Sequence, residues 1–145
     1  MFVNCSNHPS AFWSEDQRKE AEKWGKIVDL PFPKVPAEAD EEQVRLLAED
    51  VSAKILALHP CAVLCQGEFT LTYAIVSSLM SKGIRVVSAC SERDVKEEKM
   101  PDGSERKTAW FRFVRFRAYK AEERAVQTNG LQAGCRTQFF RGRMG

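Results

Sequence analysis

Short apolar runs alternate with helical patterns over the first two thirds of the chain. An apolar run of about five residues flanked by turn-forming residues is typical of a strand buried on both faces. Strands are therefore predicted at residues 2–5, 26–30, 62–66 and 84–87. Helices are predicted after the N-cap residues Ser14 and Asp40, and again from about Phe69 to the stop at Gly83. This order favours an α/β fold with a mostly parallel sheet.

The pattern changes after the fourth predicted strand. Residues 93–99 extend that strand, residues 101–103 (Pro-Asp-Gly) form a turn, and residues 108–119 alternate, which together predict an antiparallel hairpin. Aromatic and basic side chains alternate in its last strand. This alternation fits a nucleic-acid platform of stacked aromatics and phosphate-binding arginines. It fits better an ordinary edge strand with an apolar and a solvated face. The residues are Phe111, Phe113 and Phe116 with Arg112, Arg115 and Arg117.

Polar segments follow three of the predicted strands. They are residues 6–10 (Ser-Asn-His-Pro-Ser), 66–70 (Gln-Gly-Glu-Phe-Thr) and 88–93 (Ser-Ala-Cys-Ser-Glu-Arg). Loops at the carboxyl ends of parallel strands meet at one edge of a sheet, so we expect these segments to form a shared ligand site. None of them matches a Walker A or GxGxxG motif, which argues against an ATPase or a dinucleotide dehydrogenase.

The first segment offers His8 as a proton carrier or phosphate donor, although a histidine in such a turn is equally suited to structural hydrogen bonding. The second offers backbone N–H groups at a helix start, and Gly67 permits a reversal or a close approach to a ligand. Glu68 disfavours phosphate there unless it bonds ribose, pairs with an arginine or caps the helix. In the third, Arg93 is either a phosphate ligand or an ion-pair partner on the hairpin.

Composition narrows the classes of function. The 145 residues are 43% hydrophobic and 29% charged, which is typical of one globular domain. Neither a membrane span nor a secretion signal is evident, so a cytoplasmic location is expected. Five cysteines without a CxxC pair and two histidines indicate reduced core thiols and no bound metal or other cofactor.

Charge is unevenly distributed. Residues 1–119 carry 17 basic and 18 acidic side chains, whereas residues 120–145 carry five basic and two acidic ones. Because the body is nearly neutral, long nucleic acid is not an expected partner, but a small anionic ligand is compatible. We expect one domain at residues 1–119 and a flexible basic tail at residues 120–145.

Five sequence blocks resemble a known family. VNCSNHPSAFWS, VDLPFP, AVLCQGEFTLTYAIV, SACSERDV and FRFVRFR are similar to the compact stand-alone ring nucleases of type III CRISPR systems, over about residues 1–119. The resemblance implies a Rossmann-like, three-layer domain related to CARF sensors, acting as a homodimer or higher homo-oligomer. It implies cleavage of cyclic oligoadenylate, above all cyclic tetra-adenylate, by 2′-hydroxyl attack without a metal, which switches off antiviral signalling. The tail after Tyr119 does not align with that family.

The resemblance also suggests roles for individual residues. His8, Ser6 and Arg93 are the expected catalytic residues. Two alternatives remain open. One is a non-catalytic sensor or sponge for the same ring, and the other is a protein or RNA interaction module built on the Phe/Arg strand. The expected ligand-binding residues are Asn7, Ser10, Gln66, Gly67, Glu68, Phe69, Thr70, Ser88 and Ser91.

Overall fold

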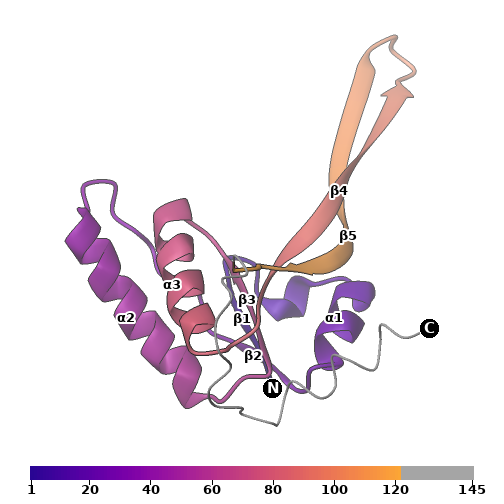
Figure 1. The fold of residues 1–145 in the computed structure, drawn as a ribbon. Helices are drawn as coiled ribbons and strands as arrows, with labels where there is room; N and C mark the ends of the chain where they lie inside the picture. The colour runs from indigo at the N-terminus through magenta and orange to yellow at the C-terminus, as the bar shows by residue number, and fades with distance from the viewer. Residues whose placement is uncertain (122–145) are drawn as a thin grey trace.

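The computed structural model describes residues 1–121 as one five-stranded sheet with helices on both faces (Figure 1). The strand order is β2-β1-β3-β4-β5, in which the first four strands are parallel and β5 is antiparallel to β4. The predicted α/β fold with a mostly parallel sheet and an antiparallel hairpin is therefore confirmed. The predicted tail lies, from residue 122 onward, outside the described residues.

The predicted elements are present, and their ends differ little from the prediction except in β4. Ser14 and Asp40 accept hydrogen bonds from the backbone N–H groups of Gln17 and Gln43, and Asp40 forms a complete capping box. The strands are β1 (Phe2–Ser6), β2 (Ile27–Asp29), β3 (Ala62–Gln66), β4 (Val86–Lys99) and β5 (Glu105–Ala118), and the helices are η1 (Ser10–Phe12), α1 (Glu15–Glu22), α2 (Glu41–Ala57) and α3 (Phe69–Ser81).

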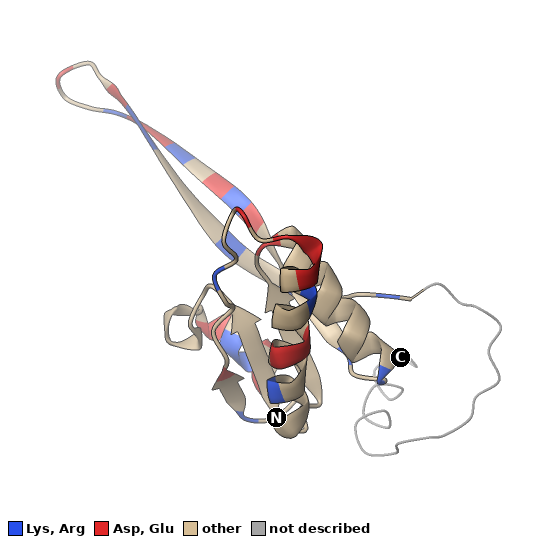
Figure 2. Ribbon diagram, turned by 90° about the vertical axis from the view of Figure 1, so that its left-hand side faces the viewer, with Lys and Arg blue, Asp and Glu red and all other residues tan. Residues whose placement is uncertain are grey.

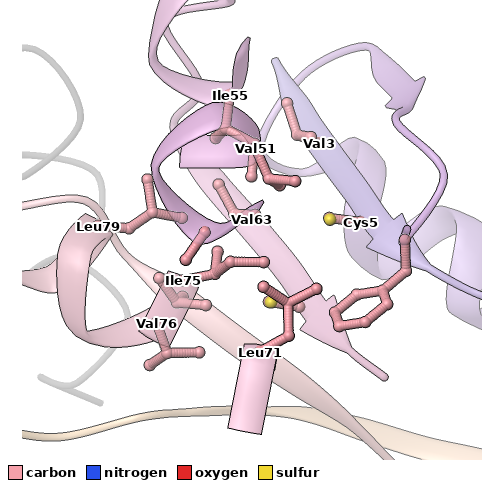
Figure 3. Packing of buried hydrophobic residues seen from close by; sticks show 13 residues of the cluster. Val3, Cys5, Val51, Ile55, Val63, Leu71, Ile75, Val76 and Leu79 are labelled. Carbon is pink, nitrogen blue, oxygen red and sulfur yellow. The ribbon is translucent and has the colours of Figure 1, made fainter. Parts of the chain in front are cut away.

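Apolar side chains pack on both faces of the sheet. On one face, α2 and α3 cover Val3, Val63 and Val86 (Figure 3). On the other face, Phe2 and Leu64 pack with the partly buried rings of Trp13 and Phe116. Because consecutive strand residues point to opposite faces, strands covered on both sides read as continuous apolar runs.

Two of the cysteines belong to this core. Cys5 and Cys65 are fully buried and lie opposite one another on β1 and β3. All four cysteines among the described residues are free thiols, and the prediction of small core residues holds for Cys5 and Cys65, whereas Cys61 and Cys90 are only partly buried.

The fourth strand is much longer than predicted. Residues 88–93 were expected to form a polar loop, but they continue β4 and pair with β5 from Ser88 opposite Arg117 to Arg93 opposite Phe111. The prediction of a third loop at the carboxyl edge is wrong, because β5 satisfies the backbone hydrogen bonds of this polar stretch. Only Val86 and Val87 pair with β3. The two strands form a ribbon that projects from the body (Figure 1).

The segment after β2 supports the turn after β3. Phe32 is buried, and a Cβ atom on Gly67 would lie only 2.4–2.6 Å from its ring. The backbone N–H of Phe32 also donates to the carbonyl oxygen of Ser6 across 3.4 Å. A glycine is required at position 67 because this aromatic ring occupies the space of a side chain.

We predict that Gly67→Ala destabilises the domain by about 1–3 kcal/mol, the usual range for an overpacked core. Chemical denaturation of the variant measures this free energy of unfolding. In a Phe32→Ala background the same change is expected to cost much less, because the opposing ring is gone. A cost that is equal in both backgrounds would contradict the assigned contact.

Candidate functional site

The strand order places a topological switch point between β1 and β3. The chain leaves β1 toward β2 on one side, and then returns to place β3 on the other side. In open parallel sheets, ligands bind outside the carboxyl ends of the strands at such a point. Ser6 and Gln66, the last residues of these two strands, lie side by side there. The first two predicted polar segments therefore meet, as expected.

A buried asparagine organises the first segment. Asn4 is 1% exposed, and its amide nitrogen donates to the carbonyl oxygen of His8 and to Oδ1 of Asp29, both at 2.9 Å. Its Oδ1 accepts from the Ser6 hydroxyl at 2.6 Å. Two of these three bonds hold the turn at residues 6–8 to β1, and the third joins β1 to the end of β2.

The Ser6 hydroxyl is part of this framework. Its oxygen also accepts from the backbone N–H of His8 at 3.2 Å, and the whole residue is buried. In the described residues no histidine or carboxylate side chain bonds this hydroxyl, so the geometry assigns Ser6 to positioning the turn and offers no activating base for a nucleophile.

Asp29 fixes the far end of the same segment. Its carboxylate accepts from the backbone N–H of Ser10 at 3.2–3.3 Å and from the Ser10 hydroxyl at 3.1 Å. The carbonyl oxygen of Ser10 in turn accepts from Arg18 at 2.5 Å. Sequence reasoning missed Asn4 and Asp29. Their signal is that each is a polar residue within or ending an otherwise apolar strand, where an unpaired polar group is costly.

These residues line a hollow of about 240 Å³ at the edge of the sheet. Its walls come from the ends of β1 and β2 and from the proline-rich segment that follows, and they comprise Asn4, Ser6, Asn7, Pro9, Asp29, Pro31 and Phe32. The volume is below the roughly 300–1,000 Å³ of pockets that enclose a whole small ligand. One chain therefore offers a partial site.

Two exposed side chains of the turn that follows β1 are available to a ligand. Asn7 and His8 are exposed, and within residues 1–121 neither side chain makes a hydrogen bond or ion pair. The backbone of His8 is nevertheless fixed, because its carbonyl oxygen accepts from Asn4 and from the Trp13 indole at 3.1 Å. The imidazole is thus presented to solvent from a rigid base, as a proton carrier requires.

Gln66 connects the switch point to the projecting ribbon. Its side-chain oxygen accepts from the backbone N–H of Ala89 at 2.7 Å, just beyond the last paired residues of β3 and β4. This bond holds Gln66 in place, and its side-chain nitrogen makes no hydrogen bond within residues 1–121.

Glu68 occupies the start of α3. Its carboxylate accepts from the backbone N–H groups of Thr70 and Leu71 at 3.0 and 2.8 Å, and from the Thr70 hydroxyl. The hydrogen bond from Leu71 is the largest cause of the lowered pKa of Glu68. Among the interpretations left open, the helix cap is the one observed. These N–H groups are therefore not available to a phosphate, whereas the ring of Phe69 is 90% exposed at the same edge.

The remaining predicted residues lie on the ribbon. Ser88, Ser91 and Arg93 belong to β4, and the last two are exposed beyond the sheet. Of the three, Ser88 lies nearest the switch point, because it precedes the Ala89 that Gln66 contacts. The structure does not bring Ser91 and Arg93 of one chain together with the segment at residues 6–10.

Aromatic and basic side chains occur on both faces of the ribbon. Arg112 lies on the face opposite to Phe111 and is paired with Glu92 at 2.5 Å and Asp94 at 3.2 Å. Arg93 of β4 lies opposite Phe111 on the same face. A nucleic-acid platform requires stacking rings and unpaired cations on the same side. Arg112 does not meet this requirement, because its charge is satisfied within the ribbon, as is typical of an edge strand.

No group of three or more histidine, cysteine or acidic side chains is placed to hold a metal ion within residues 1–121. No helix in this part of the chain is both long and apolar enough to cross a membrane.

We predict that Glu68 stabilises α3 as a carboxylate. The pKa of Glu68 is lower in the folded protein than the usual 4.5. Its contribution to the free energy of unfolding is therefore present at pH values above 4.5 and is lost as the pH falls through the folded pKa. Thermal unfolding of Glu68→Gln between about pH 6 and 3 should show a smaller loss of stability on acidification than the wild type.

Glu22→Gln, at an exposed position in the last turn of α1, is the matched control and should follow the wild-type profile. Identical profiles for Glu68→Gln and the wild type would argue against the cap.

Comparison with known proteins gave a family and no further likeness. No curated protein and no solved structure matches the chain. A family model described as the uncharacterized protein MJ1673 family matches residues 1–117, which extends from the start of β1 almost to the end of β5. The candidate site and the ribbon both lie within this match, and the chain belongs to the MJ1673 family.

Proposed function

We propose that this protein is a ring nuclease that binds and cleaves a cyclic oligoadenylate, most plausibly cyclic tetra-adenylate. The observation that carries the proposal is the meeting of the segments at residues 6–10 and 66–70 at the switch point of a Rossmann-like sheet. The resemblance of the sequence blocks to type III CRISPR ring nucleases supplies the identity of the ligand. The family match covers all the blocks but leaves the activity open.

A symmetric ring accounts for the small size of the hollow. Each chain encloses only about 240 Å³, whereas two copies related by a two-fold axis would each hold half of the same ring. The function therefore includes a homodimer in which the two carboxyl edges face one another. The exposed ring of Phe69 at this edge offers a surface on which an adenine base stacks.

The reaction needs positioning and proton transfer. The 2′-oxygen of one ribose attacks the adjacent phosphorus, the bond from phosphorus to the 5′-oxygen breaks, and a 2′,3′-cyclic phosphate remains. A base takes the proton from the 2′-hydroxyl, and the departing 5′-oxygen gains one. In-line geometry and hydrogen-bond donors to the developing charge supply most of the acceleration.

The described geometry suggests a division of roles. His8 carries the proton, because its imidazole is exposed on a fixed backbone. Asn7 and the amide nitrogen of Gln66 donate to phosphate or ribose, and Ser6 and Ser10 hold the turn. Arg93 is excluded from this set in its own chain, because β4 carries it beyond the sheet.

The test is incubation of the purified protein with labelled cyclic tri-, tetra- and hexa-adenylate in EDTA, with products and binding followed in parallel. We predict conversion of one ring to linear products with 2′,3′-cyclic phosphate ends. His8→Ala should lower the cleavage rate by about 10²–10⁴-fold while leaving ring binding nearly intact.

His59→Ala is the matched control, because His59 is the other histidine and follows α2 at the amino edge of the sheet. It should cleave normally. Tight binding without cleavage by the wild type would instead assign a sensor or sponge, and the absence of both would refute the proposal.

A further inference from the structure

The outer part of the β4–β5 ribbon has no neighbouring strand or helix among residues 1–121. Beyond Ala89 and up to Lys99, β4 pairs only with β5 in this part of the chain, which corresponds to about 33 Å of strand. A lone two-stranded ribbon is marginally stable in water. Because β4 is parallel to β3, the ribbon extends past the carboxyl edge that carries the candidate site (Figure 1).

One face of the ribbon carries a stripe of apolar side chains. The apolar stripe, defined here as Val95, Ala109, Phe111 and Phe113, continues the face on which Phe116 packs against the body. Phe111 is 75% exposed and Val95 is 51% exposed. On the opposite face Arg112 is paired with Glu92 and Asp94, so these three charges are satisfied within the ribbon.

A groove of complementary character lies between the starts of α2 and α3. This α2–α3 groove has a volume of about 390 Å³ and is lined by Ala39, Asp40, Glu41, Val44, Arg45, Thr70 and Ala74. Its wall is apolar at Val44 and Ala74, and its rim is acidic at Asp40 and Glu41. Figure 2 shows the acidic start of α2 and the mixed charges along the ribbon. The groove lies at the carboxyl edge, because both helices follow the strand ends there.

The ribbon and the α2–α3 groove are complementary in charge. Arg93 lies opposite Phe111 on the stripe face, and no carboxylate of the described residues forms an ion pair with it. Glu41 is exposed and likewise has no basic partner within residues 1–121. Since Glu42 and Glu49 already engage Arg45, Glu41 is the rim carboxylate best placed to accept a cation from outside.

We propose that the ribbon of one copy docks on a second copy of this chain, with Phe111 in the partner's α2–α3 groove and Arg93 against the groove's acidic rim. The contact is reciprocal, since each copy offers one ribbon and one groove, and it closes as a two-fold dimer. Arg93 lies only about 13 Å of strand beyond Ala89, so the two carboxyl edges approach one another. The inference rests on the homodimer of the proposed function and names its interface.

The test is sedimentation velocity of the full chain over a concentration series without any nucleotide. The wild type should have about twice the 16.4 kDa mass of one chain. Phe111→Ser, and Ala74→Phe, which fills the groove, should each weaken dimerisation by about tenfold or more. Trp110→Ser is the matched control: its side chain is also exposed but lies on the opposite face of the ribbon, so the dimer should persist.

A monomeric wild type would overturn the inference, as would a dimer that survives Phe111→Ser. A dimer that Phe111→Ser abolishes but Ala74→Phe leaves intact would also overturn it, because the ribbons would then contact one another. Circular dichroism verifies that each variant is folded.

Charge-reversal variants distinguish loss of the specific Arg93–Glu41 contact from a general folding defect. Arg93→Glu and Glu41→Arg should each weaken the dimer, and the double variant should restore it toward the wild type. Failure of the double variant to recover would contradict the pairing. Because these measurements use no ring, a dimer of the proposed kind without ring cleavage would refute the proposed function alone.

Discussion

The hydrogen bonds of the Asn4 side chain determine the shape of the candidate site. Asn4 is buried in the central strand β1 and is bonded to Asp29 on β2, to the Ser6 hydroxyl and to the carbonyl oxygen of His8. A buried amide that loses such partners costs about 1–3 kcal/mol for each unsatisfied group. The turn at residues 6–8 is therefore fixed by the same interactions that complete the core, and His8 is presented at a defined point of the sheet edge.

The turn after β3 is fixed by packing and capping instead. Phe32 fills the space next to Gly67, and Glu68 satisfies the first N–H groups of α3. A helix start that already holds its own carboxylate is a poor phosphate site. In the proposed reaction the two segments at the switch point have different roles. Residues 6–10 contribute His8 and Asn7, and residues 66–70 contribute a rigid wall, the Gln66 amide and the exposed ring of Phe69.

Much of the fold was predictable because both faces of a parallel sheet are covered. Continuous apolar runs revealed β1 and β3, and the caps at Ser14 and Asp40 marked the starts of α1 and α2. The extension of β4 was not predictable in full, because residues 88–93 are polar and are extended only through pairing with β5. The roles of Asn4 and Asp29 were missed for a related reason: they depend on which strands become neighbours, and sequence spacing does not reveal this.

An amide chemical-shift titration of the ¹⁵N-labelled protein with cyclic tetra-adenylate tests most directly the claim that the ligand binds at the switch point. The account predicts that the largest perturbations fall on residues 6–10 and 66–70, with smaller ones along the outer ribbon. The account would be contradicted if the largest perturbations fell on residues 105–115 and the signals of residues 6–10 and 66–70 stayed unchanged. That result would place the ligand on the ribbon.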